Sequence, residues 1–199
     1  MRALLVATTN RHKLDEYRAI FSDLPFQLLS LKDIQLDLDV EETGTTFAEN
    51  ATLKALAYAQ ASNMLALADD SGLEIDALNG EPGVYSARFA GEQTSYAERF
   101  RIILERLRDV PAAQRTARFR CVIALAEPSG LLRLAEGTME GLIADAPRGE
   151  HGFGYDPIFL VPDLHKTNAE LSAEQKNALS HRGAAARQAR HLLATWPQA

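Results

Sequence analysis

The sequence has a single cysteine and no long hydrophobic run, and each shortage excludes a class of protein. Cys121 cannot form a disulfide within the chain, and the apolar run around it favours a reduced, buried and inert thiol. No apolar stretch approaches the ~20 residues of a membrane-spanning helix. The opening segment, MRALLVATTN, has too short an apolar part for a signal peptide and is expected to form a strand. We therefore expect a cytoplasmic protein without a membrane partner.

An excess of positive charge is also missing. The chain has 27 Asp and Glu against 21 Lys and Arg, a formal net charge of -6. A protein that binds nucleic acid needs a basic face to replace counterions, so we expect no nucleic-acid partner. Repeats, low-complexity tracts and linker-like segments are absent as well. A chain of 199 residues can bury a sizeable core, so we expect one domain over residues 1–199.

Hydrophobic patterning predicts the fold class. Residues 3–7 and 65–68 are continuously apolar, as in strands buried on both faces, and a helical pattern follows the first of them. Residues 35–39 alternate between polar and apolar, which predicts an exposed edge strand. Residues 118–125 and 132–141 predict a hairpin around a Pro-Ser-Gly turn. We therefore predict an α/β fold with a mixed central sheet flanked by helices, in two lobes around a cleft.

The first candidate site is the segment from Thr8 to Lys13, between a predicted strand and a predicted helix. The N-terminus of a helix presents unpaired N–H groups and a partial positive charge, so a phosphate fits there, and Lys13 adds a full charge. The alternative is that Asn10 simply caps the helix. The segment lacks the glycine pattern of a P-loop, so both interpretations stay open.

The second candidate site is the acidic sequence Asp69-Asp70-Ser71-Gly72 at the end of a predicted buried strand. Ligands bind at the carboxyl ends of strands in open α/β sheets. Two adjacent aspartates repel each other and lose hydration there, and a divalent cation offsets that cost. Neighbouring side chains of a strand point to opposite faces, so the two aspartates should have different roles. The alternative is a solvated Asp-Ser-Gly turn.

The third candidate site is a helix that follows the acidic pair Glu41-Glu42. Thr46 and Glu49 form a capping box that predicts its start, which by itself explains Glu49. Asn50 and Lys54 are four residues apart and share one face of a mostly apolar helix. Lysine is rarely buried without a partner, so we expect a carboxylate or phosphate near Lys54. An acidic turn is the commoner interpretation of Glu41 and Glu42.

Two further candidates lie near the end of the sequence. In Gly152–Pro157, two glycines flank Phe153, which could stack on a base or pack into the core. Ser180 is expected to cap a final helix, which places His181 and Arg182 in its first turn. Cations are disfavoured at that end of a helix, so a ligand phosphate or carbonyl is a candidate partner. A solvated helix start is the alternative.

Taken together, these motifs resemble the inosine triphosphate pyrophosphatase family, also called the dITP/XTP pyrophosphatases. The match runs almost from end to end, and the six motifs in order are highly specific. They are Thr8-x-Asn10-x-x-Lys13, Glu41 to Lys54, Ala68 to Leu73, Pro82 to Arg88, Gly152 to Pro157 and Ser180 to Gly183. The sequence departs from the family at Thr9, where many members carry glycine. A β-branched residue restricts the backbone of this loop.

The resemblance implies an enzyme that uses Mg²⁺. It would hydrolyse noncanonical purine nucleoside triphosphates (ITP, dITP and XTP) to the monophosphate and diphosphate, and so keep these bases out of DNA and RNA. It also implies an elongated, two-lobed homodimer with the active site in the cleft. The alternatives are a nucleotide sensor without catalysis and a house-cleaning pyrophosphatase for another modified nucleotide.

The resemblance also implies a role for each site residue. Glu41 and Asp70 would hold the metal, and Asp70 would also be the base for the attacking water. Asn50, Lys54 and Asp69 would support them, and Ser71 would contact the substrate. The expected phosphate-binding residues are Thr8, Thr9, Asn10, Arg11, His12 and Lys13. The expected nucleoside-binding residues are Phe153, Gly154, Tyr155, Asp156, Lys176, His181 and Arg182.

Overall fold

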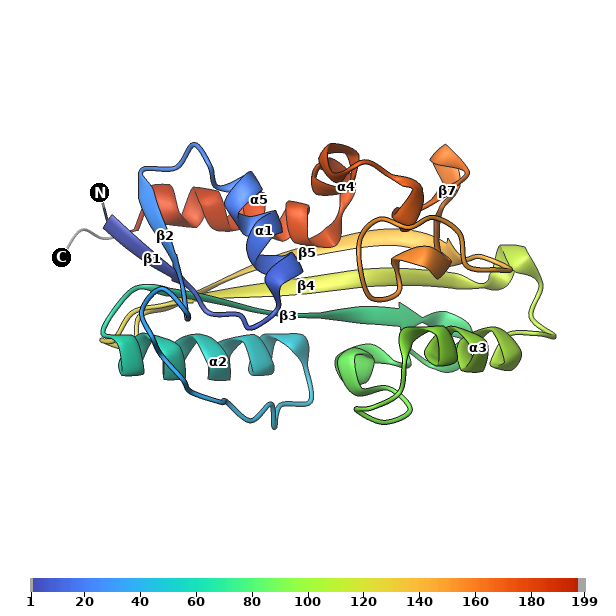
Figure 1. The fold of residues 1–199 in the computed structure, drawn as a ribbon, viewed down its shortest axis with the longest axis horizontal. Helices are drawn as coiled ribbons and strands as arrows, with labels where there is room; N and C mark the ends of the chain where they lie inside the picture. Colours follow the sequence, from blue (N-terminus) through green and yellow to red (C-terminus); the bar gives the residue numbers. More distant parts are fainter. Residues whose placement is uncertain (1, 197–199) are drawn as a thin grey trace. The chain divides into compact units, whose positions relative to one another are not determined.

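A computed structural model describes residues 2–196, in which seven strands form one hydrogen-bonded sheet in the order β2-β1-β3-β4-β5-β6-β7 (Figure 1). The strands are β1 (Arg2–Val6), β2 (Phe26–Ser30), β3 (Ala66–Ile75), β4 (Thr116–Ala126), β5 (Leu132–Ile143), β6 (Phe159–Val161) and β7 (Lys166–Thr167). β1 is parallel to β2 and β3, whereas β6 is antiparallel to β5 and β7. The predicted mixed sheet is therefore confirmed.

Five α-helices accompany the sheet in the described part of the chain. They are α1 (Arg11–Ile20), α2 (Phe47–Ser62), α3 (Tyr96–Arg106), α4 (Ala173–Leu179) and α5 (His181–Ala194). The capping box of Thr46 and Glu49 starts α2, and α5 begins at His181, both as predicted. The helices confirm the predicted α/β class.

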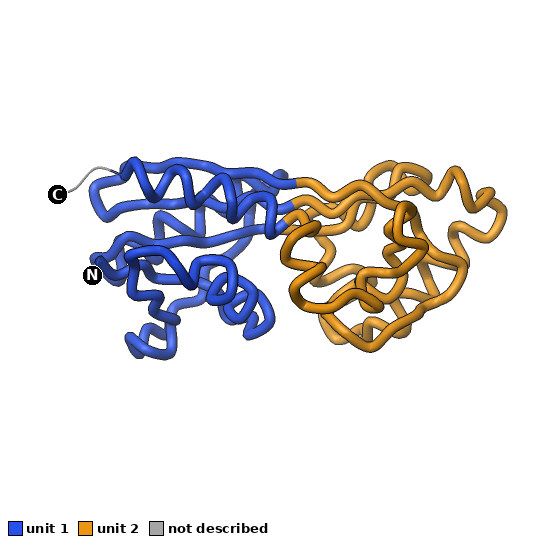
Figure 2. The backbone as a smooth tube through the Cα atoms, turned by 90° about the horizontal axis from the view of Figure 1, so that it is seen from above, with its two compact units in different colours: residues 1–70, 121–137, 182–199 blue, residues 71–120, 138–181 orange. Residues whose placement is uncertain are grey.

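The chain divides into two compact units, coloured separately in Figure 2. Unit 1 comprises the described residues within 1–70, 121–137 and 182–199, and unit 2 comprises residues 71–120 and 138–181. Strands β3, β4 and β5 contribute residues to both units. The predicted location of the active site in a cleft stays a prediction.

Each unit has its own hydrophobic core. In unit 1, α1 and α5 pack on the face of the sheet that carries Leu4, Val6 and Leu67, and α2 lies on the other face (Figure 1). Cys121 belongs to this core, so its predicted burial is confirmed, and burial raises the pKa of its thiol to about 12. The predicted inertness of the thiol stays a prediction. The core of unit 2 gathers aliphatic and aromatic side chains of β3, α3, β4 and β6, including Phe119, whose ring centre lies 4.5 Å from that of Phe159 at a tilt of 40°.

The predicted edge strand over residues 35–39 is wrong. Residues 31–35 form turns, and residues 36–40 have no regular structure. Gln35 has a φ of 53°, in the left-handed region that breaks an extended strand. The carbonyl of Leu38 instead accepts a hydrogen bond from Tyr58 of α2 at 2.8 Å. Alternation of polar and apolar residues therefore reflects packing against a helix here.

Trp196 belongs to the core of unit 1 and makes a half-buried polar contact at its edge. Its indole Nε1 donates to Glu127 Oε1 at 2.6 Å, and the Arg2 guanidinium donates to the same oxygen at 2.6 Å. The guanidinium of Arg133 lies 5.0 Å from the centre of the indole ring. The hydrogen bond from Trp196, together with Arg2, lowers the pKa of Glu127.

This contact predicts a pH dependence of stability. A carboxyl whose pKa is lowered by folding stabilises the protein above its unfolded pKa, ~4.3, and that contribution is lost as the pH falls. Glu127→Gln should therefore lower the free energy of unfolding by about 1 kcal/mol at pH 7 and by less near pH 3. Urea unfolding at the two pH values, followed by the fluorescence of Trp196, the only tryptophan, measures these free energies. An equal difference at the two pH values would contradict the prediction.

Candidate active site

Strand β3 carries the two adjacent aspartates, and both are buried. Asp69 Oδ2 accepts a hydrogen bond from Lys13 Nζ at 2.8 Å and lies 3.6 Å from Arg182 Nη2. Asp70 Oδ2 accepts a hydrogen bond from Asn50 Nδ2 at 3.0 Å. The two carboxylates thus have different partners, as the alternation of side chains along a strand predicts.

The two carboxyl groups also differ in their pKa. Burial favours the neutral form of both, but Lys13 and then Arg182 outweigh it at Asp69 and hold the pKa of that carboxyl well below its usual range. At Asp70, burial is the largest influence and raises the pKa, although Lys54 opposes it. The neighbouring cations therefore hold Asp69 as a carboxylate, whereas burial disfavours the charged form of Asp70.

The amide of Asn50 is fixed at both ends. Its Oδ1 accepts the N–H of Gly44 at 2.8 Å, which leaves Nδ2 directed at Asp70. A Cβ on Gly44 would lie 2.6 Å from the Cβ of Glu49 and 2.7 Å from Asn50 Oδ1. Gly44 is therefore required for the loop to approach α2 closely enough to orient Asn50.

Lys54 has the carboxylate partner that the sequence predicts. Its ammonium forms an ion pair with Glu42, and its side chain is only 15% exposed. Burial lowers the pKa of Lys54, but Asp70, Asp69 and Glu42 together raise it above the ordinary value. Glu42, which the sequence left as an acidic turn, is thus the acid that joins this group. Glu41 is exposed, and its metal-binding role stays a prediction.

The loop from Thr8 to Lys13 is organised by its own polar groups. Asn10 caps α1 by accepting the N–H groups of His12 and Lys13 at 3.0 and 3.3 Å, and Thr8 Oγ1 accepts the N–H of Asn10 at 3.2 Å. The capping interpretation of Asn10 is therefore confirmed. Thr9, Arg11 and His12 are exposed, and phosphate binding by this loop stays a prediction.

Arg182 is buried among carboxylates of unit 1. Its Nη1 donates to Glu16 Oε2 at 2.7 Å, and Asp69 is its second acidic neighbour. Sequence reasoning missed Glu16. The signal was present, because Glu16 lies three residues after Lys13 and shares a face of α1 with it. Lys13, Asp69, Arg182 and Glu16 therefore form one charge group, with Asp69 and Arg182 buried and Lys13 and Glu16 partly buried. The sequence predicted the first three as separate candidates and did not predict that they meet.

A second polar group surrounds Asp156 in unit 2. Asp156 Oδ2 accepts the N–H of Phe153 and the ammonium of Lys176, each at 2.8 Å, and Oδ1 accepts Asn168 Nδ2 at 3.2 Å. Lys176 Nζ also lies 4.5 Å from the centre of the Phe153 ring. Gly152 has a φ of 75°, and a Cβ there would lie 2.2 Å from Asp156 Oδ2. Nothing in the sequence identified Asn168, because no motif contains it.

The other predicted nucleoside-binding residues are placed differently. Tyr155 is buried in the core of unit 2, where its ring packs against those of Tyr96 and Phe100. His181 is also buried, with its ring stacked on Phe119 at 4.8 Å. Tyr155 therefore shows the core packing that was the alternative for this loop, and substrate contact by these two residues stays a prediction.

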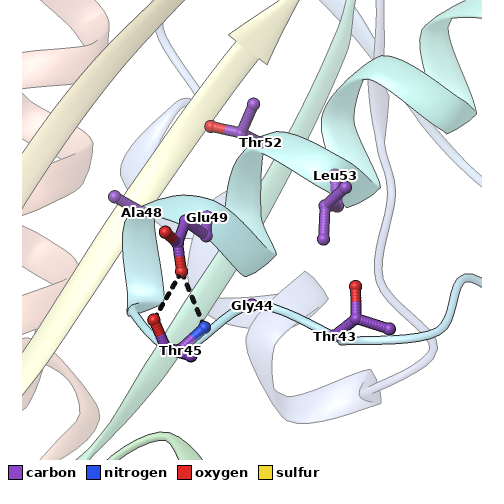
Figure 3. A pocket seen from close by; sticks show the side chains of 7 residues that line it. All are labelled: Thr43, Gly44, Thr45, Ala48, Glu49, Thr52 and Leu53. Carbon is purple, nitrogen blue, oxygen red and sulfur yellow. Dashed lines mark hydrogen bonds between the residues drawn. The ribbon is translucent and has the colours of Figure 1, made fainter.

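A cavity of about 510 Å³ opens beside the start of α2 (Figure 3). Its lining is formed by Thr43, Gly44, Thr45, Ala48, Glu49, Thr52 and Leu53. Glu49 is turned to the loop and accepts hydrogen bonds from the N–H and hydroxyl of Thr45, as the dashed lines show. Asp70, Asn50 and Lys54 do not line this cavity, so the cavity is separate from the polar group around Asp70.

Residues 2–196 contain no group of three or more His, Cys, Asp or Glu side chains arranged to hold a metal ion. In the same residues, none of the helices combines the length and the apolar character needed to cross a membrane.

Comparisons with known proteins agree with one another. The model of the Ham1 family matches residues 4–192. A dITP/XTP pyrophosphatase of Desulforamulus reducens is 50% identical over 190 residues, 96% of this chain and 94% of that protein. That of Bacillus subtilis is 47% identical over 97% of this chain and 98% of its own length. A HAM1 protein structure from Coxiella burnetii is 44% identical with a TM-score of 0.89, over 98% of this chain and 99% of that one.

Proposed function

Because the chain belongs to the Ham1 family, we propose that it hydrolyses noncanonical purine nucleoside triphosphates to the monophosphate and diphosphate. The substrates are ITP, dITP and XTP, and their removal keeps these bases out of DNA and RNA. The relatives named dITP/XTP pyrophosphatase support the substrate class. The observation that carries the reaction is the buried acid pair of β3 with Lys13 and Lys54 beside it.

We propose Mg²⁺ as the cofactor. Magnesium binds oxygen ligands, takes only one or two carboxylates and keeps several waters. The residues fit such an ion, since Asp70 is a buried carboxylate and Glu42 is an acid close enough to raise its pKa further. Asp70 would hold the ion together with an acid of the Glu41-Glu42 pair. When bound, Mg²⁺ supplies positive charge to the phosphate oxygens that become more negative during the reaction.

The side chains of the protein supply the other parts of the mechanism. A triphosphate carries about four negative charges, which Lys13 and Lys54 partly neutralise. Asp70 accepts the proton of the attacking water as a general base. In unit 2, Phe153 stacks on the purine while Asp156 and Lys176 offer an acceptor and a donor to polar atoms of the base.

The acid pair separates this proposal from one of its two alternatives, the nucleotide sensor. A nucleotide sensor would gain little from two buried aspartates beside cations, because charge repulsion and desolvation would weaken its binding of phosphates. A house-cleaning pyrophosphatase for another modified nucleotide would use the same acids. A panel of purine and pyrimidine triphosphates with product identification distinguishes the two enzymes.

The reaction itself is directly testable. With Mg²⁺, ITP should give IMP and diphosphate in one step, and an excess of chelator should abolish turnover. Anion-exchange chromatography of the products at early times measures both. Appearance of IDP as an intermediate, stepwise release of single phosphates or full activity in chelator would contradict the proposal.

We further propose a cytoplasmic homodimer with twofold symmetry, the commonest oligomer of soluble proteins. Light scattering at micromolar concentration should give twice the 21.8 kDa mass of the chain. A monomer mass under these conditions would contradict it.

A further inference from the structure

The motif Pro82–Arg88 has no role in the function proposed above. Residues Gly83–Arg88 form a 3₁₀ helix in unit 2, and Ser86 is buried within it. Its hydroxyl oxygen accepts the N–H of Leu73 at 2.9 Å and donates to the carbonyl of Gly83 at 2.6 Å. Leu73 belongs to β3 and lies three residues after Asp70.

The carbonyl of Ser86 makes a second, separate set of contacts. It accepts the hydroxyl of Tyr155 at 2.8 Å and Nη1 of Arg99 at 3.4 Å. Arg99 is only 2% exposed, and its Nη2 donates to the carbonyl of Gly91 at 3.1 Å. The Tyr96 ring lies under this guanidinium and packs edge-on against Tyr155. Tyr155 itself lies between Phe153 and Asp156 in the loop Gly152–Pro157, to which we assigned the base.

The hydroxyl of Ser86 supplies a hydrogen-bond partner for the edge of β3. Among residues 2–196, β1 pairs with β3 at Ala66 and Leu67 only, so the edge of β3 beyond these residues needs other partners. Buried backbone N–H groups are almost always hydrogen-bonded. The amide of Ile75 donates to the carbonyl of Glu81 at 3.2 Å, and that of Leu73 to Ser86. The segment from Glu81 to Ser86 therefore continues the pairing of β3.

We infer that Ser86 is a positioning residue that joins β3, just beyond the acid pair, to the loop that carries Phe153 and Asp156. Its hydroxyl fixes the strand and its carbonyl fixes the loop. The inference rests on the proposed function, because it assigns the acids to hydrolysis and the loop to the base. Ser86 then acts on the reaction through both segments without touching the substrate.

The two contacts can be removed one at a time. Ser86→Ala deletes the hydroxyl and keeps the carbonyl, so it should lower kcat on ITP about tenfold, because small displacements of catalytic groups are costly. Tyr155→Phe deletes only the hydroxyl that binds the Ser86 carbonyl. It should raise KM for ITP about fivefold, the scale of one lost hydrogen bond, and leave kcat within about twofold of the parent.

Two control variants separate positioning from stability. Ile103→Val removes one methylene from the core of unit 2 and should lower Tm without changing kcat or KM. Tyr85→Phe removes a hydroxyl from an exposed tyrosine adjacent to Ser86 and should change nothing. Ser86→Cys keeps the size of the side chain, but its sulfur is a weak acceptor for the N–H of Leu73. This variant replaces Ser86→Ala in the test if Ser86→Ala does not fold.

The measurements are kcat, KM and Tm for all variants, and the Kd of IMP by calorimetry. The expected result is a loss of kcat in Ser86→Ala or Ser86→Cys, and a weaker Kd and higher KM in Tyr155→Phe. Lower Tm values with kcat, KM and Kd equal to those of Ile103→Val would overturn the inference. The parent alone reports the proposed function through diphosphate release. If the parent released no diphosphate, the Kd of IMP would still test the contact between Tyr155 and the Ser86 carbonyl. Equal Kd values for the parent and Tyr155→Phe would then overturn the inference.

Discussion

Replacing Asp70 with asparagine should lower turnover of ITP by at least ~100-fold, the scale of a lost general base. The amide cannot accept the proton of the attacking water, and it carries no charge to hold Mg²⁺. The fold should survive, because burial already disfavours the charged form of Asp70. An amide oxygen at this position also keeps an acceptor for Asn50 Nδ2, which donates to Asp70 at 3.0 Å. The measurement is steady-state diphosphate release together with thermal unfolding.

A matched control lies farther along the same segment of the chain. Asp76 directly follows β3 and accepts two hydrogen bonds from Arg118 on an exposed surface. Asp76→Asn should therefore weaken an ion pair of small value and leave kcat near that of the parent. Turnover of Asp70→Asn close to the parent would show that Asp70 has no catalytic function. An equal loss in both variants would show that negative charge near β3, and not a specific base, supports activity.

Replacing Arg182 with alanine should lower the free energy of unfolding by about 3–5 kcal/mol, the cost of removing one partner from a buried ion pair. Arg182 is 2% exposed and donates to Glu16 at 2.7 Å, with Asp69 3.6 Å away. Its loss leaves Glu16 without that donor and removes the second cation that lowers the pKa of Asp69. Chemical denaturation at pH 7 measures the change.

Arg190 provides the control on the same helix. It forms two hydrogen bonds of 2.7 Å with Asp23, but both side chains are about half exposed. Arg190→Ala should cost less than about 1 kcal/mol, because solvent screens an exposed pair. Similar costs in the two variants would contradict a structural role for Arg182. In that case a selective loss of activity on ITP relative to ATP would favour direct contact with the base instead.

The sequence by itself determined the local elements and the family. Continuous apolar runs predicted β1 and the start of β3, a capping box predicted α2, and a turn sequence predicted the hairpin of β4 and β5. These signals are local, because they depend on hydrogen bonds and side-chain periods within a few residues. The same period failed at residues 35–39, where packing against Tyr58 of α2 replaced strand pairing.

The tertiary structure decided which charged groups meet. The sequence predicted that Lys54 needs an acid, but only the fold selected Glu42, and only the fold brought Arg182 to Glu16 across 166 residues of chain. It also placed Asn168, which belongs to no motif, against Asp156. A buried charge requires a partner wherever it lies, yet the identity of that partner depends on strand order and helix packing. Local patterns therefore show that a buried lysine or arginine needs compensation, and long-range packing determines which residue supplies it.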